Sequence, residues 1–326
     1  MNELSRRRAT SPLGTALRWA PYLAPALILY AAFMAFPLFD SVRLSFFRAG
    51  AAGSREFIGF DNYVRLFSVK ENALRFWSAF ANTWYFFFVH MAVQNVLGIL
   101  FAVLLMEKGL RFASFYRTVI FIPATLAVLV VGYLWKLILN PQWGALTLFL
   151  KAAGFGFLAH PWLGEPKYAL TAVSLVSAWQ WVGMPTMMFL AALQNIPDDM
   201  YESAEIAGAS KLQAFRYITL PMLRPVIGIV AILTFVGNFN AFDAVFAMEN
   251  VNGAPLYATD IMGTFFYRVG IAGQHPVSIP DPGMGAAVAT TTFAVLALGA
   301  ALILRLTRDD ATAAAPAEPP AGEKAK

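Results

Sequence analysis

The sequence has no cysteine among its 326 residues and only three histidines. Without cysteine, the chain cannot form a disulfide framework, a thiolate nucleophile or a cysteine-ligated metal or iron–sulfur centre. The histidines, His90, His160 and His275, are scattered along the chain and lack the spacing of metal-binding motifs. We therefore expect no metal site in this chain.

Charge is scarce as well. Charged residues make up 13% of the chain, about half of the roughly 25% that is usual in soluble domains. Apolar residues make up 59%, against roughly 45–50% in soluble domains, so part of the apolar surface must face lipid. The net charge of +5 is small and gives no reason to expect nucleic-acid binding.

Six apolar stretches are long enough to cross a membrane, since a helix needs about 20 residues to cover the roughly 30 Å hydrocarbon core. They are residues 19–39, 80–106, 118–139, 168–193, 226–248 and 283–304. The first follows Arg6, Arg7 and Arg8 and could be a signal peptide, but its apolar run exceeds the roughly 7–15 residues of such a peptide. The predicted fold is an all-α polytopic membrane protein with six transmembrane helices.

Six spans place both termini on the same side of the membrane. The loops and termini of that side carry 14 lysines and arginines, against 10 on the other side, and the excess is clearer in the short loops, from which the positive-inside rule is read. We therefore predict that both termini are cytoplasmic. Residues 1–18 then form a cytoplasmic segment, residues 19–308 the membrane domain and residues 309–326 a tail whose composition predicts disorder.

The loop between the fourth and fifth spans, residues 196–221, has more local order in its sequence than a solvated connector needs. Gly208 suits the end of one helix, and Ser210 with Gln213 has the capping-box spacing that starts another. Pro221 predicts the end of that second helix. The loop also keeps small and apolar residues on both helices. We interpret it as a helix–turn–helix docking element outside the membrane.

This loop resembles the EAA loop of the permease subunits of ATP-binding-cassette importers. The family pattern is Glu-Ala-Ala, then a glycine, then Ile-x-Leu-Pro, and this chain has Glu202-Ser203-Ala204, Gly208 and Ile218-Thr219-Leu220-Pro221. Ser203 replaces the first alanine, and Ala207 stands where the sugar-importer branch often has aspartate. The spacing and the Gly and Pro positions are kept.

The resemblance extends over nearly the whole chain. Further matches to the carbohydrate branch, including its maltose-type and glycerol-phosphate-type first permeases, are Asn82-Thr83, Phe115-Tyr116-Arg117 before Pro123, Leu193-Gln194-Asn195-Ile196-Pro197 and Asn238-Phe239-Asn240-Ala241-Phe242-Asp243. The proline-rich stretch 274–283 departs from the shorter connector that is commoner in the family.

The resemblance implies a transmembrane subunit of an ATP-driven importer for a sugar or sugar derivative, in the bacterial cytoplasmic (inner) membrane. Its implied partners are a second homologous permease, two ATP-binding-cassette ATPase subunits, an extracytoplasmic solute-binding protein and membrane lipid. The chain has no G-x-x-x-x-G-K-[ST] motif, so ATP and Mg would be bound by the ATPases, with no cofactor in this chain. We therefore expect no enzymatic activity of its own.

Two sets of site residues follow. The resemblance implies that the ATPase-coupling residues are Glu202, Ser203, Ala204, Ala207, Gly208, Ile218, Leu220 and Pro221. Polar groups inside spans are costly and usually face a cavity or another helix, and residues four apart, such as Thr234 and Asn238, share a helix face. The predicted substrate-path residues are Trp181, Gly183, Thr186, Thr234, Gly237, Asn238, Asn240 and Ala241. The alternative is that the Asn and Thr side chains only form interhelical hydrogen bonds.

Two other functions require features that this sequence does not show. An intramembrane hydrolase would need a G-x-S-x-G elbow or paired membrane aspartates, and the sequence has neither. A secondary transporter would be expected to show internal repeats and several intramembrane ionisable groups, whereas the predicted spans show no repeat and contain one aspartate, Asp243. A secondary transporter and an importer permease for a non-sugar solute remain the alternatives.

Overall fold

The computed structural model describes residues 12–49, 54–107, 109–273 and 280–313, and this part of the chain is mostly helical. The α-helices are α1 (Pro12–Tyr30), α2 (Phe36–Leu44), α3 (Asp61–Ser68), α4 (Lys70–Val89), α5 (Val96–Leu105), α6 (Ala113–Thr125), α7 (Val128–Ile138), α8 (Ala145–Ala152), α9 (Pro166–Trp181), α10 (Gly183–Leu193), α11 (Asp198–Ile206), α12 (Lys211–Ala214), α13 (Leu220–Phe239), α14 (Asp243–Glu249), α15 (Met262–Tyr267) and α16 (Pro282–Ala313). The π-helical turns are η1 (Ala31–Ala35), η3 (His90–Asn95), η5 (Phe215–Thr219) and η6 (Arg268–Ala272), and η4 (Gly156–Leu158) is a 3₁₀ turn. Strands β1 (Phe47–Ala49) and β2 (Arg55–Phe57) form one antiparallel hairpin.

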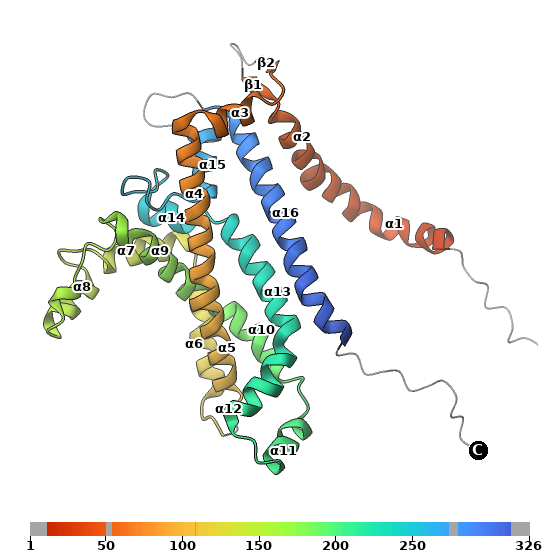
Figure 1. Ribbon diagram of the computed structural model, residues 1–326, viewed down its shortest axis with the longest axis vertical. Helices are drawn as coiled ribbons and strands as arrows, with labels where there is room; N and C mark the ends of the chain where they lie inside the picture. The colour runs from red at the N-terminus through yellow and green to blue at the C-terminus, as the bar shows by residue number, and fades with distance from the viewer. Residues whose placement is uncertain (1–11, 50–53, 108, 274–279, 314–326) are drawn as a thin grey trace, which may run out of the picture.

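The long helices lie lengthwise in the molecule (Figure 1). The α4–η3–α5 helix, α13 and α16 run side by side, with α11 and α12 at one end, called here the loop end, and β1, β2 and α3 at the opposite hairpin end. The α1–η1–α2 helix leaves the hairpin end and leans away from the other helices (Figure 1), and none of the most apolar window of this helix is buried. That surface is left for lipid or for another chain.

The predicted set of six continuous spans is found only in part. Among the described residues, four helices are long and apolar enough to cross a membrane, Trp19–Leu44, Lys70–Leu105, Lys211–Phe239 and Pro282–Thr307. The predicted third span is bent by 97° between α6 and α7, because Leu126 and Ala127 have extended backbone. The predicted fourth span is divided into α9 and the shorter α10.

Two predicted boundaries around the fifth span are wrong. Pro221 does not end a helix, since α12, η5 and α13 run as one helix from Lys211 to Phe239. A proline in a straight helix removes a hydrogen bond and clashes with the preceding turn, and the π-helical turn η5, just before Pro221, relieves this. The helix then ends at Phe239 rather than Met248, and Asp243 begins the separate helix α14.

The predicted terminal segments lie largely outside the described residues. Helix α16 continues to Ala313, and the rest of the predicted tail 309–326 is outside the described part, as are residues 1–11 of the predicted N-terminal segment. The proline-rich stretch 274–283 is described only from residue 280 onward.

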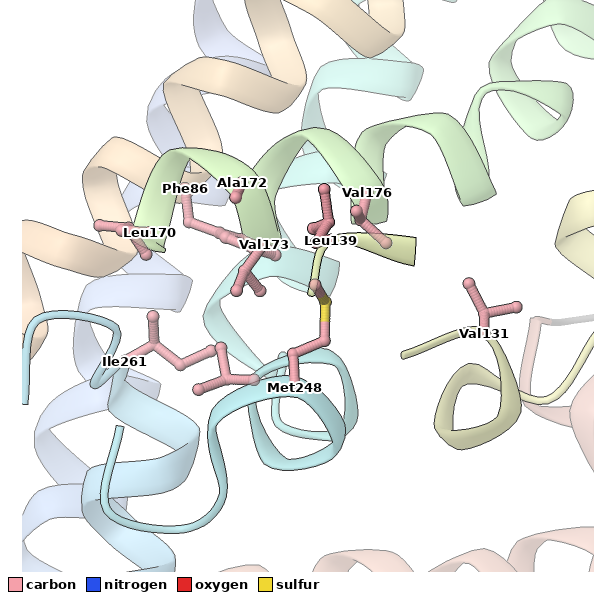
Figure 2. Close-up of a cluster of buried hydrophobic side chains, with 10 residues drawn as sticks. Phe86, Val131, Leu139, Leu170, Ala172, Val173, Val176, Met248 and Ile261 are labelled. Carbon is pink, nitrogen blue, oxygen red and sulfur yellow. The ribbon is translucent and has the colours of Figure 1, made fainter. Parts of the chain in front are cut away.

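An apolar cluster holds the bent outer helices against the long ones (Figure 2). It joins α4, α7, α9 and α14 through the buried side chains Phe86, Val131, Leu139, Leu170, Ala172, Val173, Val176, Val245, Met248 and Ile261. Helix α7 can approach α14 closely because Gly132 has no side chain. A Cβ atom at this position would collide with Ala247. The bend between α6 and α7 is therefore fixed by packing.

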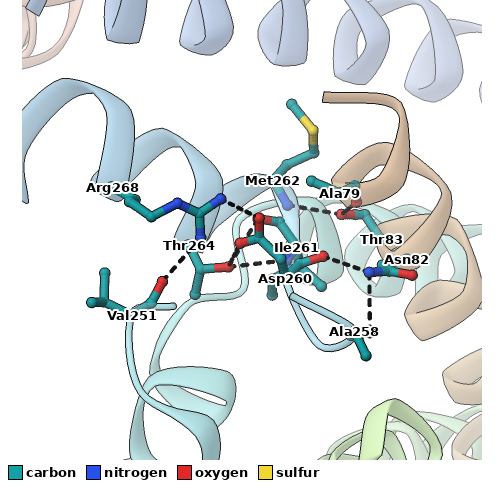
Figure 3. Close-up of polar contacts among 10 residues, drawn as sticks. All are labelled: Ala79, Asn82, Thr83, Val251, Ala258, Asp260, Ile261, Met262, Thr264 and Arg268. Carbon is teal, nitrogen blue, oxygen red and sulfur yellow. Dashed lines mark hydrogen bonds and ion pairs between the residues drawn. The ribbon is translucent and has the colours of Figure 1, made fainter. Parts of the chain in front are cut away.

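A buried ion pair fastens the connector between α14 and α15 (Figure 3). The guanidinium of Arg268 contacts the carboxyl group of Asp260, and both side chains are only 2% exposed. Thr264 Oγ1 donates to Asp260 Oδ1 at 2.7 Å, and Arg268 also donates to the carbonyl oxygen of Val251 at 3.3 Å. Each charged group thus has a partner in the low-dielectric interior.

The same connector is bound to α4 by two polar side chains (Figure 3). Asn82 Nδ2 donates to the carbonyl oxygens of Ala258 and Asp260 at 3.1 and 2.9 Å, and the backbone N–H of Met262 donates to Thr83 Oγ1 at 2.9 Å. The hairpin end is therefore cross-linked by polar contacts that are internal to the chain.

Replacing Asp260 by alanine should destabilise the protein by about 3–5 kcal/mol, because Arg268 would keep a buried charge without its partner. The measurement is equilibrium unfolding of the detergent-purified chain. Glu107→Ala is the control: its pair with Lys211 is exposed, with side-chain exposures of 64% and 93%, and such pairs contribute roughly 0–1 kcal/mol. Equal losses in the two variants would contradict the structural role of Asp260.

Candidate functional site

A cavity of about 550 Å³ lies where the helices of the chain are interrupted. Its wall is built by α4, η3, α7, α9, α10, α13 and α14, together with the residues between α13 and α14. Most of the lining is apolar, and its polar side chains are His90, Gln94, Ser177, Thr234, Asn238, Asn240 and Asp243. An apolar cavity of this size with a few polar groups is typical of small-molecule sites, which measure about 300–1,000 Å³.

The cavity contains most of the predicted substrate-path residues. Those in its lining are Trp181, Thr234, Gly237, Asn238, Asn240 and Ala241. Gly183 is not in the lining; a side chain there would collide with the backbone of Ile120 and Phe121, so its role in the structure is to let α10 pack on α6. Thr186 is also outside the lining, is fully buried and donates to the carbonyl oxygen of Val182 at 2.8 Å.

The polar face of α13 serves both packing and the cavity. Thr234 Oγ1 donates to the carbonyl oxygen of Val230 at 2.8 Å and accepts from Asn95 Nδ2 at 3.1 Å, which is the interhelical bond considered as the alternative. Asn238 Nδ2 donates to the carbonyl oxygen of Thr234 at 2.7 Å. The Asn238 amide group therefore turns its N–H toward its own helix and keeps Oδ1 as an acceptor.

Residues of span two that the sequence did not single out as path residues form the opposite wall. His90 Nδ1 lies 2.8 Å from the carbonyl oxygen of Phe86, which can only accept, so Nδ1 carries the proton and Nε2 accepts from Ser177 Oγ at 3.1 Å. Gln94 lies one turn further along, and its Oε1 is buried without a hydrogen-bond partner. A helical reading of the sequence does place residues 90 and 94 on one face, but it gives no sign of the π-helical turn that carries them.

At the loop end, the predicted glycine turn and capping box are present, whereas the predicted helix end at Pro221 is not. Gly208 has a φ of +77°, a left-handed conformation that side-chain-bearing residues rarely adopt, and it ends α11. Ser210 and Gln213 form the capping box, with Gln213 N donating to Ser210 Oγ at 3.3 Å and Ser210 N donating to Gln213 Oε1 at 2.7 Å. Two apolar side chains at this end are strongly exposed, Ile206 at 89% and Leu212 at 75%.

The predicted coupling residues of this loop differ in how far they are exposed to solvent. Glu202, Ser203, Ala207, Gly208 and Pro221 are exposed, whereas Ala204, Ile218 and Leu220 are half-buried. Tyr201 Oη and Thr219 Oγ1 are hydrogen-bonded at 2.9 Å, which ties α11 to the helix that continues into α13. The loop end is thus a knob fixed to a long helix, and Ile206, which the sequence analysis left out, is its most exposed apolar side chain.

Residues 94–308 match the family described as "Binding-protein-dependent transport system inner membrane component". The chain belongs to this family. It is 33% identical over 249 residues to the probable ABC transporter permease protein YurN of Bacillus subtilis (strain 168), covering 76% of this chain and 83% of that protein. It is 31% identical over 250 residues to the lactose transport system permease protein LacF of Rhizobium radiobacter, covering 76% and 81%.

A solved structure has the same fold. It is a bacterial alginate ABC transporter in complex with an alginate pentasaccharide-bound periplasmic protein, and one of its chains aligns with a TM-score of 0.76 at 21% identity, covering 93% of this chain and 98% of that chain. The family match and the two relatives make this chain a permease component of an ABC importer rather than a secondary transporter or an intramembrane hydrolase.

Helix α14, which contributes Asp243 to the cavity, ends in a buried acid. Glu249 is only 7% exposed and its Oε1 has no partner. Burial raises the pKa of Glu249 to about 8, and the positive charge of Lys136 opposes the shift. The carboxyl group of Glu249 loses its proton near pH 4.5 in the unfolded chain but only near pH 8 in the folded protein. The free energy of unfolding therefore decreases as the pH rises from about 4.5 to about 8.

The thermal unfolding midpoint of the purified chain should accordingly fall between pH 5 and pH 8 and level off above. In Glu249→Gln, which stays neutral, the fall should be smaller, so that the variant is the more stable protein at pH 8. The exposed Glu107→Gln serves as the matched control and should follow the wild-type curve. Parallel curves for Glu249→Gln and wild type would show that Glu249 is ionised in the folded protein.

Proposed function

We propose that this chain forms half of the translocation path for a sugar or sugar derivative in an ATP-driven importer, and that its loop end couples the path to a cytoplasmic ATPase. The observation that carries the proposal is one continuous helix, Lys211–Phe239, which starts at the exposed knob and ends in the wall of the cavity. A rigid helix of this kind transmits a displacement of the knob directly to the residues that face the solute.

The sugar class is supported by the lining and by a relative. Amide and hydroxyl groups form hydrogen bonds with sugar hydroxyls, and an aromatic face such as that of Trp181 covers the apolar C–H side of a sugar ring. The relative LacF is named as a lactose transport permease. A permease for a non-sugar solute stays the alternative within the family.

The membrane arrangement proposed is the six-span one. The spans are the α1–η1–α2 helix, the α4–η3–α5 helix, α6 with α7, α9 with α10, the α12–η5–α13 helix and α16. The loop end and both termini then lie in the cytoplasm, and the hairpin end lies outside the bacterial inner membrane. In this arrangement the uncovered α1–η1–α2 helix faces lipid or the second permease.

The partners follow from this orientation. An extracytoplasmic solute-binding protein delivers the solute at the hairpin end, and a second, related permease completes the path. Two ATPase subunits bind ATP and Mg and receive the knob, with Glu202 facing them and Ala204 and Gly208 permitting close approach. Exposed Ile206 and Leu212 supply the apolar contact, since such side chains in water are otherwise a cost.

The test is affinity purification of the tagged chain in mild detergent from its native membranes, followed by mass spectrometry. The expected result is a complex with a second six-span permease and an ATPase that carries a phosphate-binding G-x-x-x-x-G-K-[ST] motif. Recovery of the chain alone, or as a homodimer without an ATPase, would overturn the proposal.

Substituting valine for Gly208 should reduce ATP-driven uptake roughly tenfold or more while the protein still reaches the membrane, because a loss of about 1.4 kcal/mol at the docking surface weakens the contact about tenfold. Valine at a φ of +77° forces the turn to change and displaces α11. Gly154→Val is the matched control, since Gly154 has a φ of +82° and equal free space in the loop after α8. Normal uptake by the Gly208 variant, with ATPase retained in the complex, would exclude the coupling role.

A further inference from the structure

A short helix at the hairpin end carries apolar side chains that no described residue covers. Figure 1 shows this helix, α3, next to the ends of α4 and α16. Its Asn62 and Leu66 are fully buried against these helices. Phe60, which precedes the helix, and Val64 are 68% and 55% exposed, and Phe67 is exposed as well. The last three residues are spaced by four and three positions, so they lie along one side of α3.

The circumference of α3 divides into three sectors. At about 100° per residue, the three exposed apolar side chains fall within a sector about 60° wide, and the buried pair occupies a second sector. The third sector holds the polar side chains Asp61, Arg65 and Ser68. Both charged residues of α3 have partners within the chain: Arg48 pairs with Asp61, and Asp281 pairs with Arg65. A helix with a protein side, an apolar side and a polar side fits the boundary between protein, lipid and water.

The attachment of α3 to the start of α16 sets its height relative to the membrane. Arg65 Nη1 donates to Asp281 Oδ2 at 3.1 Å, directly before α16 begins. From Pro282 to Leu304, α16 has no charged side chain, and this run is about 35 Å long. The hydrocarbon core is roughly 30 Å thick. When Arg305 lies at one face of this core, α3 therefore lies at the opposite face.

The first span gives the same height for α3. The α1–η1–α2 helix has no charged side chain from Trp19 to Phe39, a run of about 32 Å. Strand β1 follows this helix closely, and the carbonyl oxygen of Phe47 in β1 accepts from Asn62 Nδ2 of α3 at 2.9 Å. Two spans that end beside α3 thus place it independently at the face of the hydrocarbon core.

The apolar side of α3 continues onto a helix long enough to span the membrane. The rings of Phe67 and Trp77 lie with their centroids 6.2 Å apart, and Leu74 and Trp77 are exposed on α4. The exposed residues of the two helices form what is called here the α3 patch: Phe60, Val64, Phe67, Leu74 and Trp77. Tryptophan is enriched where a span meets the headgroup layer, and Trp, Phe and Leu are typical of the apolar face of helices that lie in this layer.

We propose, resting on the membrane arrangement of the proposed function, that the α3 patch is a lipid-contact surface whose partner is phospholipid of the outer leaflet. Helix α3 lies in the headgroup layer, with its apolar sector against the acyl chains, its polar sector toward water and its buried sector on the other helices. Because α3 is bonded to β1 and to the residue before α16, this contact holds the hairpin end at a fixed depth in the membrane.

The experiment places the photo-crosslinking amino acid benzoylphenylalanine at single positions of the tagged chain, in native membranes labelled with an alkynyl fatty acid. The test positions are those of Phe60, Val64 and Phe67, and the first and last keep an aromatic ring. Ser68 is the matched control, because it is exposed on the same helix but lies in the polar sector. After irradiation, the chain should carry at least about tenfold more fatty-acid label from the test positions, since burial in lipid favours an aromatic ring by at least this factor.

Three results would overturn the proposal. They are a crosslink from the test positions to a second permease or a solute-binding protein, equal labelling from the control position, and no lipid label at any position. Retention of the ATPase by each crosslinker-bearing chain shows that the chain has folded and assembled. An ATPase-bound chain without lipid label overturns only the role of the α3 patch, whereas a labelled chain that never assembles with an ATPase overturns only the importer assignment.

Discussion

The structure depends on one constraint, that a chain inside a membrane must satisfy its own backbone hydrogen bonds. Unbroken helices meet it automatically, so each interruption needs a partner from within the protein. At the break between α6 and α7, the carbonyl oxygen of Leu126 accepts from Gln180 Nε2 at 3.1 Å, and Gln180 is almost fully buried for this purpose. The cavity lies at these interruptions: Val128 follows the first, Trp181 precedes the second, and Asn240 follows the end of α13. A solute site thus exists where the helices are allowed to stop.

The same constraint explains why some expectations from sequence held and others failed. Gly208 and the Ser210–Gln213 capping box were predictable because turn and cap geometry is local. The break between α6 and α7 was not predictable from the sequence. The two residues with extended backbone there, Leu126 and Ala127, are apolar, and neither is Gly or Pro. Pro221 pointed to a helix end, but a π-helical turn absorbed the proline, and a sequence pattern does not reveal such a turn.

The candidate site was likewise predictable only as far as single helices allow. The spacing of Thr234 and Asn238 places both on one face of α13, and both line the cavity. Gly183 was predicted as a path residue, but the structure places it outside the cavity lining, where the lack of a side chain lets α10 pack against α6. Which wall faces α13, and hence the position of Gln94, depends on the packing of helices distant in sequence.

The two ends of the molecule are built for different mechanical roles under the proposed function. At the hairpin end, Asp260, Arg268 and Asn82 satisfy one another and the backbone within the chain, so this end is a fixed frame that holds the connector beside the cavity. At the loop end, Ile206 and Leu212 remain exposed, so this end is complete only when another protein covers it. Helix Lys211–Phe239 joins the loop end to the cavity wall, where it ends. A displacement of the knob would therefore leave the hairpin end in place and move the polar wall of the cavity, which lies between the two ends of the molecule.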